Sequence, residues 1–248
     1  MFQKTPALLL DQADRQEWEL PVRGLEEPLI LDTHFLGLTP LNDIQSENHE
    51  FDCIAISGLA SHPFGSWQPK GKDKGFMWIR DALPRALPMM RAILYGYDTT
   101  LIRSNSFQTI GDLASSLVNH IKANGWYLAD SKRLVFLAHS LGGIVLKEAF
   151  WMMANGDSQG QRILDRFLGG IFFGVPSHGM EASHLLAMVR GQVNEEFVDA
   201  LSSSSKYLRL LDDHFAGLIS TRDMHFRWAF ETKTSPTVAV SAQLSPCF

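Results

Sequence analysis

The sequence predicts an α/β protein with a doubly wound, mostly parallel sheet. Apolar stretches without polar alternation recur along the chain, which is typical of strands covered on both faces. Segments with helical periodicity separate these stretches, and strands that alternate with helices form a sheet flanked by helices. The strongest single observation is LVFLAHSLGG at residues 134–143, where an apolar run ends at Ser140 and a helix-compatible run follows at once.

Strands are expected from apolar runs and from alternation. Four continuous apolar runs predict buried strands at residues 53–57, 91–97, 134–138 and 169–175. A short edge strand is expected within residues 28–39. Alternating aromatic side chains in HFRWAF predict a late strand at residues 225–230.

Helices are expected between these strands. One covers residues 78–87, where Pro84 kinks or ends it, and another covers residues 110–122, where apolar residues recur at helical spacing. A third, at residues 144–153, is apolar nearly all round, as a buried helix is. The pattern is mainly helical over residues 181–220, where we expect a cap-like insert.

Ser140 is expected at the tip of a sharp strand-to-helix turn, the geometry of a nucleophile elbow. Ala138 and Gly142 flank it and are small, as the close approach of strand and helix requires. Such a turn is strained and pushes the hydroxyl out of the sheet, so it is hard to explain by packing. The alternative is an ordinary S-x-G turn without chemistry, but the strand and helix context favours an elbow.

A second feature is FDCIAISGLASHPFGSW at residues 51–67, where a predicted strand runs into a loop that contains glycine. Hydrolases with a nucleophile elbow hold the oxyanion with two backbone N–H groups, one after the nucleophile and one from a loop after an earlier strand. We therefore expect Leu141 and Leu59 to supply the two donors. Taken alone, the loop also fits an ordinary turn.

With these residues in view, the chain resembles the lipase-like α/β-hydrolases related to the serine-active-site-containing protein and to GPI inositol-deacylases. Fungal versions often form the N-terminal domain of NACHT- or NB-ARC-type proteins. The matching segments are residues 36–43, 51–67, 77–84, 91–99, 134–149, 169–179 and 228–236. The resemblance implies an α/β-hydrolase fold and a serine esterase or lipase-like activity on acyl esters of lipids.

The sequence departs from this family in three places. Ser57 stands where the oxyanion loop usually has histidine before Gly58, and residues 175–178 read Val-Pro-Ser-His in place of Thr-Pro-His. Glu231, at the end of the late strand, is the candidate acid; its alternative is a solvated glutamate. The catalytic histidine of this fold follows the acid, but none of the 17 residues after Glu231 is histidine.

Other histidines are therefore weighed as the base. His139 is expected to diverge from Ser140 and to be structural, whereas His62 and His178 lie in loops at the expected active-site edge and are candidate substitutes. Two explanations stay open. The hydrolase fold lacks its C-terminal end in this chain, or the chain is a catalytically degenerate domain that serves as a binding or signalling module with regulatory protein partners.

Length and composition limit the domain organisation, partners and location that this chain can have. The 248 residues, 45% hydrophobic, suit an N-terminal extension at 1–35 and one hydrolase domain at 36–248. A net charge of −5 argues against nucleic acid as a partner. Two cysteines and no signal peptide or transmembrane segment predict a cytoplasmic protein, with association to a membrane surface left open. Neither a metal-ligand spacing nor a phosphate-binding loop occurs, so no metal or cofactor is expected.

Overall fold

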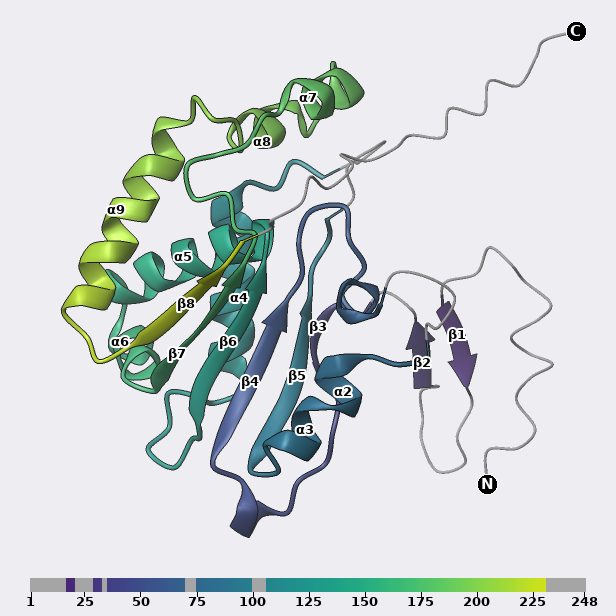
Figure 1. The fold of residues 1–248 in the computed structure, drawn as a ribbon, viewed down its shortest axis with the longest axis vertical. Coiled ribbons are helices and arrows are strands. Elements are labelled where there is room, and N and C mark those ends of the chain that lie inside the picture. The colour runs from purple at the N-terminus through teal and green to yellow at the C-terminus, as the bar shows by residue number, and fades with distance from the viewer. Residues whose placement is uncertain (1–16, 21–28, 33–34, 70–74, 100–105, 231–248) are drawn as a thin grey trace, which may run out of the picture.

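A six-stranded sheet forms the centre of the molecule (Figure 1). The computed structural model describes residues 17–20, 29–32, 35–69, 75–99 and 106–230. The strands lie in the order β3-β5-β4-β6-β7-β8, and only β3 runs antiparallel to its neighbour. Their bounds are β3 Gly37–Pro40, β4 Phe51–Ile56, β5 Met90–Gly96, β6 Arg133–His139, β7 Phe167–Phe173 and β8 His225–Ala229. The predicted α/β class with a mostly parallel sheet is confirmed.

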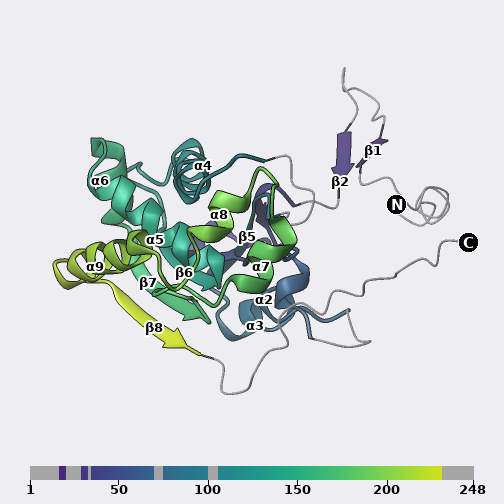
Figure 2. The same ribbon diagram turned by 90° about the horizontal axis from the view of Figure 1, so that it is seen from above.

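Helices cover both faces of this sheet, which confirms the doubly wound arrangement. Figure 2 shows α4 and α5 on one side and α2 and α3 on the other. Side chains of β4 alternate accordingly: Ile54 and Ile56 join the core beneath α4 and α5, whereas Cys53 and Ala55 pack with α2. The helices are α2 Trp78–Asp81, α3 Leu83–Ala86, α4 Ile110–Ala123, α5 Leu141–Ala154, α6 Ser158–Leu164, α7 Ser183–Val189, α8 Glu195–Asp199 and α9 Lys206–Ser220, with 3-10 turns η1 Ser46–Asn48 and η2 Gly65–Trp67.

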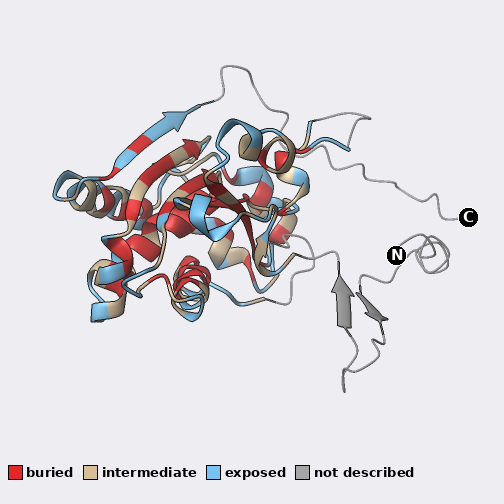
Figure 3. Cartoon of the chain, turned by 90° about the horizontal axis from the view of Figure 1, so that it is seen from below, coloured by how far each residue is buried: buried red, intermediate tan, exposed pale blue. Residues whose placement is uncertain are grey.

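Local sequence explains where the helices begin and end. Thr109 and Asp112 form a capping box that starts α4, because each side chain bonds the backbone of the other residue. Pro84 divides the helix predicted at 78–87 into α2 and α3 and lies in the first turn of α3, where its missing N–H is not needed. In Figure 3 the central strands are drawn mainly in the buried colour, as their continuous apolar runs predict.

The N-terminal region holds more strand than expected. β1 Glu17–Leu20 and β2 Leu29–Asp32 pair antiparallel in a two-stranded sheet of their own. One edge strand was expected within residues 28–39, but the structure has two strands in this region. β2 pairs with β1, whereas β3 is an edge strand of the six-stranded sheet. The boundary between an extension and a hydrolase domain at residue 35 stays a prediction.

The region at residues 181–220 is helical, as predicted, but its helices differ in position. Figure 1 shows α7 and α8 beyond the carboxyl ends of the strands, whereas α9 runs along the side of the molecule. Leu208, Leu211 and Phe215 of α9 are buried in the same core as α5. A cap role stays a prediction, and it concerns α7 and α8, because α9 belongs to the layer that flanks the sheet.

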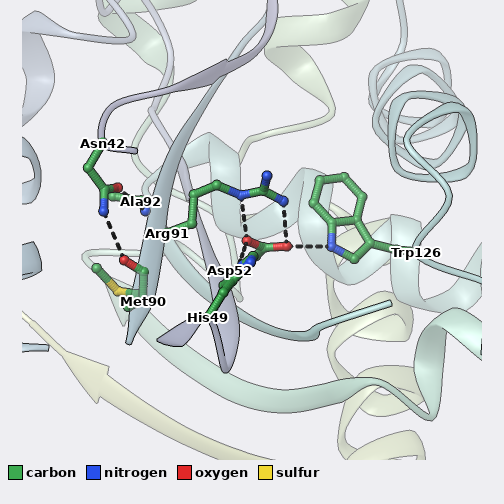
Figure 4. Close-up of polar contacts among 7 residues, drawn as sticks. All are labelled: Asn42, His49, Asp52, Met90, Arg91, Ala92 and Trp126. Carbon is green, nitrogen blue, oxygen red and sulfur yellow. Dashed lines mark hydrogen bonds and ion pairs between the residues drawn. The ribbon is translucent and has the colours of Figure 1, made fainter. Parts of the chain in front are cut away.

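A buried carboxylate fixes the amino end of the sheet (Figure 4). Asp52, near the start of β4, is 1% exposed and accepts two hydrogen bonds from Arg91 of β5, at 2.8 and 3.0 Å. The indole Nε1 of Trp126 donates at 2.8 Å, and the Nε2 of His49 lies 2.8 Å from the same carboxylate. One side chain therefore joins β4, β5 and the segment after α4, at the opposite end of the sheet from Ser140.

Asp52→Asn is expected to lower the free energy of unfolding by about 1.5–3 kcal/mol, because the hydrogen bonds from Arg91 and Trp126 lose their charged acceptor. Urea denaturation followed by tryptophan fluorescence measures the change. Asp43→Asn is the control: Asp43 is exposed, so its effect should stay within about 0.5 kcal/mol. Equal midpoints for both variants would show that the buried carboxylate does not stabilise the sheet.

Candidate active site

Ser140 lies in a strained turn between β6 and α5. β6 ends at His139, α5 begins at Leu141, and Ser140 between them has φ 51° and ψ −124°. A residue other than glycine rarely adopts a positive backbone φ, so the surrounding structure must hold Ser140 in this conformation. The Ser140 N–H donates to the carbonyl of Phe173 at 2.9 Å, and its own carbonyl accepts from Gly143 at 3.0 Å. The predicted strand–turn–helix geometry is confirmed.

The first turn of α5 packs against two loops so closely that only glycine fits. A Cβ atom at Gly142 would lie 2.4 Å from the carbonyl oxygen of Ser57, in the loop after β4. A Cβ atom at Gly143 would lie 2.2 Å from Cγ2 of Val175, in the loop after β7. Both distances are shorter than real contacts allow, so these two glycines let both loops reach the start of α5.

Gly58 lies directly beside the Ser140 side chain. A Cβ atom at Gly58 would lie 2.8 Å from the Cβ of Ser140, 3.3 Å from its Oγ and 3.1 Å from the Nδ1 of His139. Atoms of His139 and Ser140 both lie close to Gly58, and the His139 ring also packs edge-on against Trp67, with ring centres 6.4 Å apart. The structural role expected for His139 stays a prediction.

The two expected oxyanion donors belong to residues that adjoin Ser140 or Gly58 in the sequence. Leu141 is its neighbour in sequence and the first residue of α5, and Leu59 follows Gly58 in the loop after β4. The candidate acid, Glu231, lies outside the described residues. The strand before it ends at the same edge of the sheet, because Ala229 of β8 pairs with Phe173 of β7.

The two histidines considered as substitute bases have other partners. The Nδ1 of His62 accepts the backbone N–H groups of Phe64 at 3.2 Å and Gly65 at 3.1 Å, which holds it in the η2 turn. The Nε2 of His178 lies 3.4 Å from the carboxylate of Asp212, and its side chain is 78% exposed. The Asp212 carboxylate is therefore an acid that lies beside His178.

The remaining histidines of the described residues lie in other settings. His49 contacts Asp52 at the amino end of the sheet, and His225 begins β8 at that same end. His120 bonds the backbone within α4, and His214 stacks on Trp151. His184 lies in α7, whereas His34 falls outside the described residues. Within the described part of the chain, no three His, Cys, Asp or Glu side chains gather as metal ligands.

Sequence reasoning missed a buried ion pair behind the elbow. Lys147 of α5 is 2% exposed, and its Nζ donates to the carboxylate of Asp212 in α9 and, at 2.6 Å, to the Oγ of Ser177. The ammonium also lies 5.5 and 5.4 Å from the ring centres of Phe172 and Phe215. Burial lowers the pKa of Lys147, and the bond to Asp212 opposes this shift. The one available signal was a lysine in a mostly apolar helix, whose only other charged residue is Glu148.

An apolar groove of about 390 Å³ lies beside the loop after β4. Its apolar walls are Phe107, Ile110, Val193, Phe197 and Ala200. Its polar lining residues are Gln108, Thr109, Glu148, Glu196 and Tyr207, and the side chains of Tyr207 and Glu148 are hydrogen-bonded at 2.8 Å. A smaller hollow that includes Leu59 shares Phe197 and Gln108 with this groove, so the groove adjoins the loop that carries the expected oxyanion donor.

Solved structures with a similar arrangement are lipases and related enzymes. Phospholipase PlaB from Legionella pneumophila has a TM-score of 0.51 at 14% identity, and the match covers 73% of this chain and 37% of that one. The fold is that of the α/β-hydrolases. Mature lipase BlEst2 from Bacillus licheniformis has a TM-score of 0.45 at 12% identity, over 78% of this chain and 70% of the lipase. A lipase-esterase related protein from Clostridium acetobutylicum has a TM-score of 0.40 at 11% identity, with 78% of each chain covered.

No protein-family model and no curated protein sequence matches this chain. At these low identities, the structural similarity establishes the hydrolase fold alone. This chain spans 37% of the PlaB chain.

Gly142→Ala is expected to lower the free energy of unfolding by about 1–3 kcal/mol, because the new methyl group meets backbone atoms that cannot swing aside. Gly217→Ala in α9 is the matched control. Nothing lies within 4 Å of a Cβ atom there, so the control should be stabilised by about 0.5–1 kcal/mol. Thermal or urea denaturation measures both changes, and a stabilised Gly142→Ala variant would contradict the close packing described above.

Proposed function

We propose that this chain is a serine hydrolase that acts on acyl esters, with Ser140 as the nucleophile. One observation carries the proposal: Ser140 adopts positive φ between β6 and α5, with its hydroxyl beside Gly58. Strain of this kind persists where the surrounding structure enforces it, and it concentrates at functional sites. The hydroxyl at this turn stands at the carboxyl edge of the sheet, where ligands bind in open α/β folds.

The backbone N–H groups of Leu59 and Leu141 are the proposed oxyanion donors. Leu141 is the first residue of α5, where the helix dipole favours negative charge. Donors that are fixed before the reaction stabilise the charge that develops on the carbonyl oxygen, and removing one such donor typically costs about 100- to 1,000-fold in kcat.

The proposed reaction has two halves. The Ser140 oxygen attacks the carbonyl carbon, the hydroxyl proton passes to a base, and the alcohol leaves with a proton from that base. Water then attacks the acyl-serine ester, releases the acid and restores the hydroxyl. Glu231 is the proposed acid that orients the base. In this fold the base is a histidine after the acid, and no histidine follows Glu231 in this sequence.

The acyl chain of the substrate is proposed to lie in the apolar groove. The hollow that Leu59 lines shares Phe197 with the groove, so a carbonyl held by Leu59 places its chain beside Phe197. Phe107 is 78% exposed at this groove, so apolar surface there is available for a hydrocarbon chain. These features favour lipid-like esters over small polar ones.

A relationship of this chain to one particular group of lipase-like hydrolases is also proposed. The segments that resemble lipase-like hydrolases related to the serine-active-site-containing protein and GPI inositol-deacylases include β4, β6 and β7 and the loops around Ser140.

Within the described residues, no helix has the length and apolar character needed to cross a membrane. Cys53 is buried and free, and burial raises its pKa to about 12. A free thiol is consistent with action in a reducing compartment.

A second candidate function is a degenerate hydrolase domain that binds a ligand or a regulatory protein partner without catalysis. The placement of the histidines favours it: His62 accepts backbone hydrogen bonds and His178 contacts Asp212. Without a base, the serine hydroxyl is a weak nucleophile. The next experiment separates the two functions.

A fluorophosphonate probe is expected to label the wild-type protein and to leave Ser140→Ala unlabelled, because the probe reacts with an activated serine oxygen. Gel fluorescence after a timed reaction measures the labelling. Ser220→Ala, at the exposed end of α9, is the control and should label like the wild type. His62→Ala and His178→Ala in the same assay identify the base, if labelling disappears in one of them alone. A folded wild-type protein that stays unlabelled would overturn the hydrolase proposal in favour of the binding module.

Ala200→Phe is expected to fill the groove and to lower kcat/KM for long-chain esters by about tenfold or more, with little change for an acetate ester. Hydrolysis of p-nitrophenyl esters of increasing chain length measures this selectivity. Ala216→Phe adds the same bulk at an exposed site on α9 that lines neither the groove nor the hollow beside Leu59, and it should leave the chain-length profile unchanged. Equal losses for acetate and long-chain esters in Ala200→Phe would place the acyl chain elsewhere.

A further inference from the structure

The loop after β4 is held by hydrogen bonds to its own carbonyl groups. The Ser61 hydroxyl donates to the carbonyl oxygen of Gly58 at 2.6 Å. In a trans peptide the carbonyl and the following N–H belong to one plane and point in opposite directions. The bond from Ser61 therefore sets the direction of the Leu59 N–H, which points away from the Ser61 hydroxyl.

The preceding peptide is fixed in a similar way. The Tyr97 hydroxyl donates to the carbonyl oxygen of Ser57 at 2.8 Å, and the first turn of α5 packs against that oxygen at Gly142. Tyr97 is 6% exposed, and burial raises its pKa, with Tyr95 adding to the shift. The phenol therefore stays protonated at neutral pH and keeps donating.

Two further bonds attach the loop to the segment after β5. Ala60, with φ 49°, donates its N–H to the carbonyl of Thr99 at 3.1 Å, and the Thr99 hydroxyl donates to the carbonyl of Ser61 at 3.1 Å. The loop is thus anchored at successive residues, and its anchors come from Tyr97 and Thr99. Such an anchored loop loses little freedom when a ligand binds its N–H groups.

We propose that Ser61 and Tyr97 are positioning residues for the oxyanion hole: their hydroxyls fix the two peptides around Gly58 and aim the Leu59 N–H at the space beside Ser140. The inference rests on the proposed function, since it concerns the donor that would hold the oxyanion. Neither hydroxyl touches the substrate. Each acts through the peptide that it orients, so its loss lowers transition-state stabilisation more than ground-state binding.

The first test removes the Ser61 hydroxyl. Ser61→Ala is expected to lower kcat for a p-nitrophenyl ester about ten- to a hundredfold with little change in KM, since the donor is misaligned and not deleted. Ser61→Thr retains the hydroxyl and should recover most of the wild-type kcat. Ser66→Ala is the matched control, because Ser66 makes the same kind of bond, to the carbonyl of His62 at 2.8 Å, in the next turn. It should hydrolyse the ester like the wild type.

The second test removes the phenol hydroxyl. Tyr97→Phe should lower kcat in the same direction as Ser61→Ala, whereas Tyr95→Phe should not. Tyr95 stacks on Tyr97 with ring centres 5.8 Å apart, and its hydroxyl lies 3.4 Å from the Ser116 oxygen, away from the loop. A merely structural role would lower the melting temperature of Ser61→Ala or Tyr97→Phe without this split between kcat and KM.

The results that would overturn the positioning role differ from the results that would overturn the proposed hydrolase function. Rates of fluorophosphonate labelling are measured for the same variants, because the phosphonyl oxygen uses the same donors as the ester. A labelled wild type with equal labelling and equal kcat in Ser61→Ala and Tyr97→Phe would overturn the positioning role alone. A folded wild type that neither labels nor hydrolyses would overturn both. Slower labelling in these two variants, with unchanged Ser66→Ala and Tyr95→Phe, supports the proposal.

Discussion

The close packing of α5 on the loop after β4 is the contact on which the candidate site depends. At Gly142 the helix backbone approaches the Ser57 carbonyl so closely that no Cβ atom fits between them. This approach brings Gly58 beside Ser140, and the same helix turn accepts Val175 of the loop after β7 at Gly143. Three segments that are distant in sequence therefore meet at one helix turn. The positive φ of Ser140 is the strain that accompanies this meeting.

Outside this turn, buried charged side chains hold the strands and helices together. Asp52 gathers Arg91 and Trp126 at the amino end of the sheet, and Lys147 pairs with Asp212 behind the elbow. Buried ion pairs add little net stability compared with apolar packing, but breaking one leaves an uncompensated charge. The two pairs therefore disfavour alternative arrangements of the strands and of α9. A sheet and helix layer fixed in this way tolerates the strained turn at Ser140, which lies at the opposite end of the sheet from Asp52.

Local patterns in the sequence predicted much of this structure. The apolar runs identified β4, β5, β6 and β7 within two residues, since burial on both faces requires such runs. The elbow was also predictable, because its strand, small residues and helix are contiguous. Contacts between distant segments were not: Tyr97 and Ser57 are 40 positions apart, and Lys147 and Asp212 are 65 apart.

The proposed oxyanion loop and the base that the proposed reaction needs are separable parts of this candidate site. The loop is complete in the described residues, since Tyr97, Ser61 and Thr99 fix it without help from the end of the chain. Glu231, the proposed acid, follows Ala229 by two residues in the sequence, and β8 ends with Ala229 at the edge that carries Ser140. A hydrolase that loses its base keeps the stabilisation supplied by the oxyanion hole and by substrate binding. The anchored loop is therefore compatible with both proposed functions, because the proposed contact between the Leu59 N–H and a carbonyl oxygen does not require that an ester bond is cleaved.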